Sequence, residues 1–328
     1  MKLRVHNVSD GESLAYPLPL LVGETEGSAQ DGRLTVHSST DPPDVFTEWP
    51  VVEGNFKVLV RLQPGVNTVT LRCGQDWLTI TLRYDRPDFV HFVRPVYVVC
   101  SDDDGYFQGP SEEDCSAQSA AKRIAFGAEI IQTLTAEKMH EHGFGRVTLN
   151  LETDDQGCSV CHIFQSKLRL EEAYSMTGSV YELWSYFGKE LMTSPLFAHK
   201  SRCKFYCFMS FTRYNLPKDS CLPKTHSDIL KHTKGHTALG GGGLALFGTG
   251  NLHTWADSVS RFSQCMTNRR KMDRRKFMDD SAYRSGHYYW ANYATGLGAS
   301  LHELGHTFDL AHTPTGIMAR GFDDLHKV

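Results

Sequence analysis

The sequence lacks a long hydrophobic run, a strong net charge and an even number of cysteines. No stretch of about 18 apolar residues occurs, so we expect no transmembrane helix and no membrane partner. The formal net charge of −4 over 328 residues gives no basic excess, so we expect no nucleic-acid partner. Nine cysteines, and an N-terminus that turns polar within its first residues, favour reduced thiols and a cytoplasmic protein.

What the sequence does contain is apolar material and histidine. Hydrophobic residues make up 40% of the chain and aromatic residues 11%, which suits the cores of about two domains. The 16 histidines are the unusual number, because imidazole is the commonest metal ligand and the usual proton carrier. Their count does not indicate which of them act, so the spacing between them decides.

Residues 1–88 are expected to form a small all-β sandwich domain. Apolar and polar side chains alternate over residues 51–62, 68–72 and 77–84, as they do in half-buried antiparallel strands. Residues 85–88, with the sequence Asp-Arg-Pro-Asp, mark the boundary of this domain. No chemistry is visible in the segment, and we expect a structural or adhesive role for it.

Residues 89–328 have a mixed α/β pattern, so the fold class is mixed α/β with the all-β sandwich in front. Ser111 resembles a helix N-cap, because three acidic residues follow it. The expected strands are residues 93–100, 146–152 and 202–211, and the expected helices are residues 111–141, residues 171–192 and a last helix that starts near Trp290.

The strongest chemical signal is the run His302-Glu303-Leu304-Gly305-His306 in that last helix. Histidines at positions i and i+4 lie on one helical face, so His302 and His306 can bind one metal ion. Glu303 is offset from this pair and can act as general base on a water held by the metal. His312 becomes a third ligand if the chain bends near Asp309, which leaves one tetrahedral position of a zinc ion open.

The same segment resembles a known family. The metzincin zinc peptidases share the pattern HExxHxxGxxH followed by a methionine turn, and here Gly316-Ile317-Met318 comes after His312. The longer stretch HELGHTFDLAHTPTGIMARGFDD resembles the eukaryotic zinc metalloproteinase family whose members are named "putative", some with a C-terminal jacalin-like lectin domain. The resemblance implies Zn²⁺ on His302, His306 and His312, Glu303 as catalytic base, and Met318 as the hydrophobic floor of the site.

Two departures from the metzincin pattern stand out. Asp309 replaces the usual glycine, at a position where we expect a bend with positive φ; alternatively, Asp309 accepts a hydrogen bond from a ligand imidazole. The chain also ends ten residues after Met318, where metzincins continue with a further helix. No tyrosine just past Met318 is present to serve as an extra metal ligand, and Phe322 stands nearby. This favours a protease domain that is truncated at its C-terminus and has an incomplete cleft.

The glycine run at residues 240–243 leads into the apolar residues 244–247. In metzincins an extended edge strand above the zinc pairs with the substrate backbone. Such an edge strand is one interpretation of this segment, and a glycine-rich loop before an ordinary core strand is the other. The candidate residues for the edge strand are Gly243, Leu244, Ala245, Leu246 and Phe247.

Two further groups of metal-ligating residues remain open. A structural zinc site at Cys158, Cys161, Cys203 and Cys207 is one interpretation, and buried free thiols are the other. For Cys221, His226, His232 and His236 a solvated loop is favoured over a ligand cluster.

The sequence therefore predicts a zinc metalloendopeptidase acting on a peptide or protein, with Glu303 activating a zinc-bound water. The alternative is a catalytically impaired pseudo-peptidase, a zinc-stabilised module that binds proteins. A third reading is a zinc hydrolase acting on another kind of amide. Neither the oligomeric state nor the cleavage specificity is readable from the sequence.

Overall fold

The structure is a computed structural model of the chain, and it describes residues 2–26, 31–42, 44–176, 180–197, 199–281 and 286–327. The chain divides into two compact units. The first contains residues 1–89 together with residues 132–159 and 258–263; the second contains residues 90–131, 160–257 and 264–328. The helices in the described ranges are all too short or too polar to cross a bilayer.

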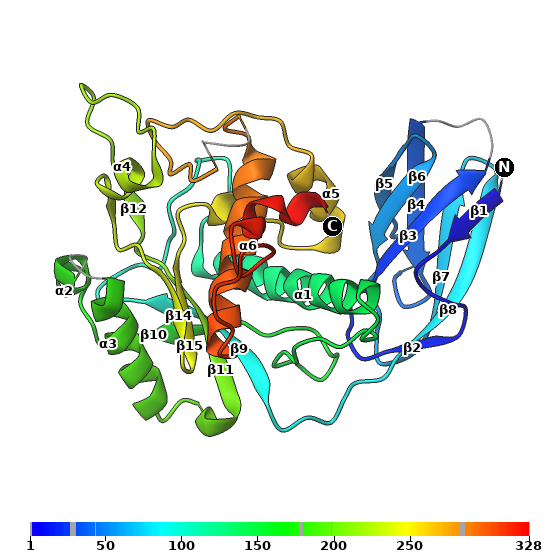
Figure 1. Cartoon of the computed structure of the whole chain (residues 1–328), viewed down its shortest axis with the longest axis horizontal. Coiled ribbons are helices and arrows are strands. Elements are labelled where there is room, and N and C mark those ends of the chain that lie inside the picture. Colours follow the sequence, from blue (N-terminus) through cyan, green and yellow to red (C-terminus); the bar gives the residue numbers. More distant parts are fainter. Residues whose placement is uncertain are drawn as a thin grey trace. The chain divides into compact units, whose positions relative to one another are not determined.

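The first unit is built on one eight-stranded sheet, drawn in blue and cyan in Figure 1. Its strands are β1 (Lys2–Val5), β2 (Glu12–Leu14), β3 (Leu20–Glu26), β4 (Asp31–Ser38), β5 (Thr47–Val52), β6 (Asn55–Leu59), β7 (Gly65–Cys73) and β8 (Asp76–Tyr84). The strand order is β1-β3-β6-β5-β4-β7-β8-β2, with only the β2–β8 pair parallel. The strands form one curled hydrogen-bonded sheet, and a two-layered sandwich stays a prediction.

The segment expected as one strand over residues 51–62 is two strands. Glu53 and Gly54 form the turn between β5 and β6, with φ of 50° and 76°. Two successive positive φ values are typical of a two-residue hairpin turn, in which Asn-Gly or Asp-Gly is the usual signal. Glu-Gly is a weak form of that signal. The alternation of apolar and polar side chains continues across it, so the sequence pattern does not reveal the turn.

Residues 146–152 do not form the expected strand. The polar groups of this segment bind the end of the preceding helix instead: Gln132 donates its side-chain amide to the Leu149 carbonyl, and the Thr148 hydroxyl donates to the Gln132 carbonyl. The Arg146 guanidinium donates to the Glu137 carboxylate at 2.8 Å. These bonds tie the segment to α1, and it does not become a strand of the sheet.

The second unit contains a five-stranded mixed sheet, which confirms the mixed α/β class. Its strands are β9 (Phe92–Val99), β10 (His162–Gln165), β11 (Cys203–Met209), β14 (Ala238–Gly241) and β15 (Leu244–Gly248). They are ordered β10-β9-β11-β15-β14, and only β14 runs antiparallel to its neighbour. A short pair, β12 (Arg213–Tyr214) and β13 (Thr233–Lys234), lies outside this sheet.

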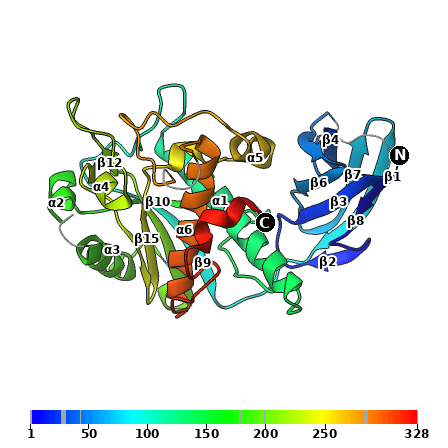
Figure 2. The same ribbon diagram turned by 45° about the horizontal axis from the view of Figure 1, so that its top comes forward.

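Helices cover both faces of this sheet, as Figures 1 and 2 show. The helices α2 (Leu170–Ser175) and α3 (Val180–Thr193) pack on the face that receives Phe205 and Cys207 of β11. The intervening Tyr206 points to the opposite face, where its hydroxyl bonds Ser300 of α6 (Tyr289–Thr307). This alternation along β11 holds α6, the predicted last helix, against the sheet.

Two expected helices differ from the prediction. α1 (Ala117–Glu141) begins later than Ser111, because the Ser116 hydroxyl accepts the first free N–H, from Ser119. The helix expected over residues 171–192 is the two helices α2 and α3, and residues 177–179 lie outside the described residues. The remaining helical segments are α4 (His226–Leu230), α5 (Val259–Met266), η2 (Lys200–Arg202), η3 (Leu252–Thr254) and η4 (Gly321–Lys327).

Candidate functional site

Three histidine side chains meet at the end of α6. His302 and His306 lie one turn apart on the helix, and their Nε2 atoms are 3.2 Å apart. The Nε2 of His312 is 3.2 Å from each of them. The three nitrogens form an almost equilateral triangle, and the structure brings together the three predicted ligands.

The chain turns sharply at Asp309 to return His312 to the helix. α6 ends at Thr307, and the Gly305 carbonyl accepts from the N–H groups of both Phe308 and Leu310. Asp309 follows with φ of 62°, so the predicted bend with positive φ is confirmed. Aspartate tolerates this left-handed conformation better than most residues other than glycine, which explains how it replaces glycine there.

Backbone carbonyls fix the tautomer of two of the imidazoles. The Nδ1 of His302 lies 2.7 Å from the Ile317 carbonyl, and the Nδ1 of His306 lies 2.8 Å from the Leu310 carbonyl. Because a carbonyl only accepts, each Nδ1 must carry the proton. A neutral imidazole then presents a lone pair at Nε2, which is the form that binds metals. For these two histidines the acceptor is a carbonyl, not the Asp309 side chain.

The donor set fits a zinc ion. Two of the three converging nitrogens carry lone pairs that face one another at 3.2 Å, and such an arrangement is repulsive without a cation between them. Ligand nitrogens about 2.0–2.1 Å from a tetrahedral zinc lie about 3.3 Å from one another, close to the observed spacing. Among the described residues, these three histidines are the one set of three potential ligands whose atoms lie within 4.8 Å of one another.

Met318 packs against α6 at Gly305, next to the ligand candidate His306. Its side chain is 6% exposed, and its Sδ would lie 2.6 Å from a Cβ placed on Gly305. The methionine sulfur occupies the space that a side chain at position 305 would need. This explains why a glycine stands in the motif between Glu303 and His306. Met318 is identifiable from its position after the histidine motif, whereas no sequence pattern predicts this packing role for Gly305.

Glu303 is held by the neighbouring strand. Its Oε2 accepts the Gly240 N–H of β14 at 2.7 Å. A Cβ on Gly240 would lie 2.6 Å from the Glu303 carbonyl carbon and closer still to its oxygen, so strand and helix are in backbone contact there. Only glycine permits this approach.

The edge of the sheet is one strand away from the predicted position. Leu244–Gly248 forms β15, which pairs with β11 on one side and with β14 on the other, so it is internal and fully buried. The prediction of an edge strand at residues 243–247 is therefore wrong, because an edge strand has one neighbour only. The edge is β14, which contains the first two glycines of the run at residues 240–243.

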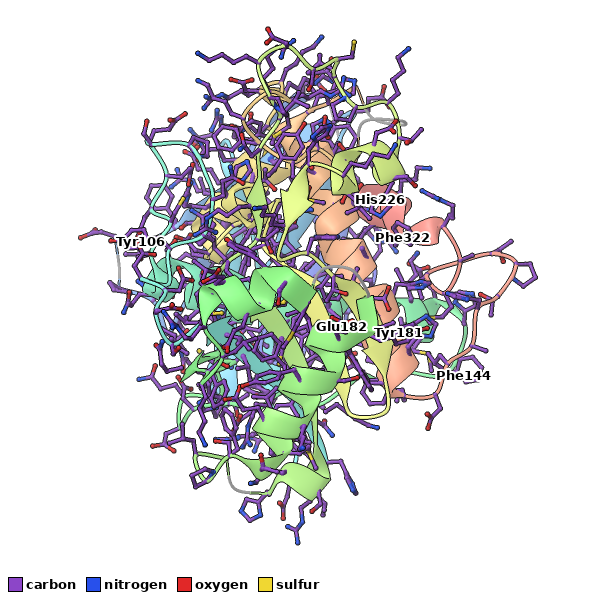
Figure 3. All side chains as sticks on the ribbon, turned by 90° about the vertical axis from the view of Figure 1, so that its left-hand side faces the viewer. Tyr106, Phe144, Tyr181, Glu182, His226 and Phe322 are labelled. Atoms are coloured by element: carbon purple, nitrogen blue, oxygen red, sulfur yellow. The ribbon has the colours of Figure 1, made fainter. Side chains whose placement is uncertain are left out.

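A pocket of about 280 Å³ opens beside His302 and Glu303. His226, His236 and Asp280 line it, as do the aromatic rings of Phe247 and Phe322. Figure 3 labels His226 and Phe322 close together next to α6. His226 and His236 belong to the group for which a solvated loop was favoured; Cys221 and His232 of that group do not line the pocket.

The predicted alternative metal sites are not assembled in the described ranges. No further set of three ligand atoms converges there, whether from Cys158, Cys161, Cys203 and Cys207 or from the group of Cys221. Cys203 and Cys207 are buried in the core between β11 and α3, and burial raises the pKa of the Cys207 thiol well above its usual value. The Cys207 thiol is therefore a protonated core residue.

The chain is similar to proteins of a known family. A family model named Metallopep and described as "Putative peptidase family" matches residues 2–328. The protein named "Putative zinc metalloproteinase C607.06c" of Schizosaccharomyces pombe is 25% identical over 98% of this chain and 52% of its own length. "Putative zinc metalloproteinase YIL108W" of Saccharomyces cerevisiae is 23% identical over 98% of this chain and 48% of its own length. The chain thus spans about half the length of the curated relatives it matches.

Among solved structures, two forms of OgpA from Akkermansia muciniphila are similar to this chain. The catalytically inactive form in complex with an O-glycopeptide substrate and the wild-type form have 12% and 14% sequence identity. Each has a TM-score of 0.39 and covers 69% of this chain and 50% of its own. The match of the family model over residues 2–328 decides the sequence family, and it confirms the resemblance to the zinc metalloproteinases that the HELGH motif indicates. The chain belongs to the Metallopep family of peptidases.

Proposed function

We propose that this chain is a zinc-dependent endopeptidase of the metzincin type, with the zinc on His302, His306 and His312. The observation that carries the proposal is the triangle of Nε2 atoms at 3.2 Å beside a carboxylate on the same helix. Zinc at this triangle would supply a Lewis acid that polarises the scissile carbonyl and lowers the pKa of a water. Membership in the peptidase family supports a peptide or protein as the substrate.

Glu303 is the catalytic base in this proposal. The Gly240 N–H binds Oε2 and restrains the carboxylate, which leaves Oε1 to act on a water in the pocket that Glu303 lines together with His302. From there the carboxylate takes a proton from the attacking water and delivers it to the nitrogen of the leaving amine. Such general acid–base catalysis contributes about 10²–10⁴-fold to the rate.

The exposed edge of β14 would bind the substrate backbone. Along each strand of an antiparallel pair, the backbone N–H and C=O groups of successive residues face the partner strand and away from it in turn. Since the Gly240 N–H donates to Glu303 and not to β15, the outer-facing backbone groups that remain for a peptide are the Gly240 carbonyl and the N–H and carbonyl of Ala238. A peptide that pairs there would pass Glu303, as in recognition by strand addition.

The same proposal assigns the remaining parts. Residues 89–328 form the metzincin-like peptidase domain, with Met318 as the methionine turn beneath the ligands. Residues 1–88 form the all-β sandwich domain that precedes it, and its role is a separate question. The support for Met318 is its burial and its contact position at Gly305.

The test compares zinc-loaded wild type with Glu303→Gln on a mixture of natural peptides, with new termini identified by mass spectrometry. Glutamine keeps an oxygen for the Gly240 N–H but takes up no proton, so we expect retained zinc and stability with cleavage reduced at least about 10²-fold. Inactivity of both proteins with zinc bound would favour the zinc-stabilised binding module. Equal activity of both would remove Glu303 from the mechanism.

A further inference from the structure

The pocket beside Glu303 has aromatic walls and a polar end. Phe247, Trp255 and Phe322 line it, and His302 and Glu303 form part of the same lining. A volume of about 280 Å³ admits a large side chain. A residue whose side chain enters this pocket therefore has its backbone at the proposed site of cleavage.

Close contacts at glycines hold the pocket walls in place. A Cβ on Gly248 would lie 2.6 Å from Nδ1 of His236, and one on Gly250 would collide with the sulfur of Met278. His236 and Met278 can occupy their positions only because these two residues have no side chain. Both also line the pocket, so its shape is fixed by close packing.

The polar end offers a hydrogen-bond acceptor. His226 Nδ1 and Asp280 Oδ1 are 2.8 Å apart, and the Asp280 side chain is 18% exposed. An ionised carboxylate can accept several hydrogen bonds, so Asp280 can accept a further donor besides this contact. The Nδ1 of His236, whose ring centre is 6.4 Å from that of His226, is buried without a partner in the described part of the chain. A buried nitrogen without a described partner and a carboxylate with acceptor capacity, in one pocket lined by aromatic rings, suit a ligand side chain with a polar tip.

We infer that this pocket binds the side chain of the residue adjoining the scissile bond, and that Asp280 selects side chains with an apolar body and a hydrogen-bond donor at the tip. The aromatic walls bury the body of the side chain. The carboxylate accepts the terminal donor, so tyrosine is preferred over phenylalanine, and aspartate and glutamate are rejected by like charge. This assignment rests on the proposed peptidase function.

The first experiment profiles cleavage of the natural peptide mixture by the zinc-loaded full chain. One hydrogen bond to a charged group corresponds to a preference of about tenfold or more for tyrosine over phenylalanine next to the cleaved bond. Asp280→Asn should remove this preference. Asp273→Asn, which changes an exposed carboxylate in the same segment, is the matched control and should keep it. Cleavage without the preference, or a preference that survives Asp280→Asn, overturns the inference.

The second experiment does not depend on catalysis. Binding of 4-methylphenol and of toluene, the side-chain analogues of tyrosine and phenylalanine, is measured by ligand-observed NMR on the same three proteins. We expect 4-methylphenol to bind wild type and Asp273→Asn about tenfold more tightly than toluene, and this advantage to vanish in Asp280→Asn. Equal binding, or no binding of either, overturns the inference. Absence of cleavage together with selective binding would instead reject the peptidase function and keep the pocket.

Discussion

The backbone N–H of Gly240 donates to the carboxylate of Glu303 at 2.7 Å, across a sequence separation of 63 residues. This bond joins the edge strand β14 to the middle of the histidine motif on α6. It orients the proposed base and, at the same time, sets the distance between the base and the strand that would bind the substrate. Much of the behaviour of the site should therefore depend on a residue with no side chain.

Replacing Gly240 should damage both stability and catalysis. A methyl group there overlaps the Glu303 backbone, so we expect Gly240→Ala to lower the free energy of unfolding by about 1–3 kcal/mol. Because the base moves with the strand, cleavage should fall by about 10²-fold. Urea unfolding and peptide cleavage measure the two effects. Gly243→Ala is the control, since a Cβ there meets nothing within 4 Å; similar losses in both variants would refute the role of Gly240.

Gly305→Ala separates helix propensity from packing. Alanine in a helix interior is favoured over glycine by about 0.5–1 kcal/mol, so propensity alone predicts a more stable protein. The added Cβ would lie 2.6 Å from the Met318 sulfur, and we expect a net loss of about 1–3 kcal/mol instead. In a Met318→Ala background the same substitution should become neutral or stabilising. A double-mutant cycle by urea unfolding decides, and additive effects would exclude the contact.

Substitutions at Asp309 should follow the cost of a positive φ. At φ of 62°, Asp309→Gly and Asp309→Asn should keep zinc affinity, whereas Asp309→Val should weaken it, because a β-branched residue is strained by at least about 1 kcal/mol there. Zinc affinity by competition with a chelating dye measures the order. If valine binds zinc as tightly as glycine does, the bend does not place His312.

The positions Gly240, Gly305 and Asp309 show how much of the site the sequence could predict. The i, i+4 spacing places His302 and His306 on one face of any helix, and the return of His312 required a bend that Asp309 supplies. The role of Gly240 was not predictable, because a run of four glycines carries no alternation that identifies a strand or its neighbours. The pocket was equally hidden, since His226, His236 and Asp280 approach one another only through the tertiary fold.

The fold was predictable where periodicity is strong and unpredictable where side chains replace backbone pairing. The strands β9 and β11 and the helix α6 lie within a few residues of the expected ranges. Residues 146–152 have the composition of a strand, but Thr148 and Arg146 bind side-chain and backbone groups around α1 instead. Such contacts between distant residues decide local structure, and no local pattern records them.

Acid should destabilise the chain through His253. Burial, together with the positive charges of Arg123 and Arg270, lowers the pKa of His253 from 6.5 to about 3. The unfolded state therefore binds a proton below about pH 6.5 that the folded state does not bind until about pH 3. The free energy of unfolding then decreases as the pH falls through this window, by up to about 1.4 kcal/mol per pH unit.

The variant His253→Leu removes this group and should flatten the acid limb of stability against pH. Urea midpoints between pH 4 and pH 7 measure the slope, and His140→Leu, at an exposed position, is the control. An unchanged slope in His253→Leu would show that the imidazole is already protonated in the folded chain.

The measurement closest to the central claim is the zinc content of the purified full chain after dialysis against metal-free buffer, by atomic emission. The account predicts about one zinc per wild-type chain, and little or none in His302→Ala, His306→Ala or His312→Ala. The reason is that three imidazoles form the zinc site and each variant removes one of them. Asp309→Asn, which leaves all three imidazoles in place, should keep its zinc. A wild-type chain without zinc when zinc is supplied, or single histidine variants that retain it in full, would contradict the account.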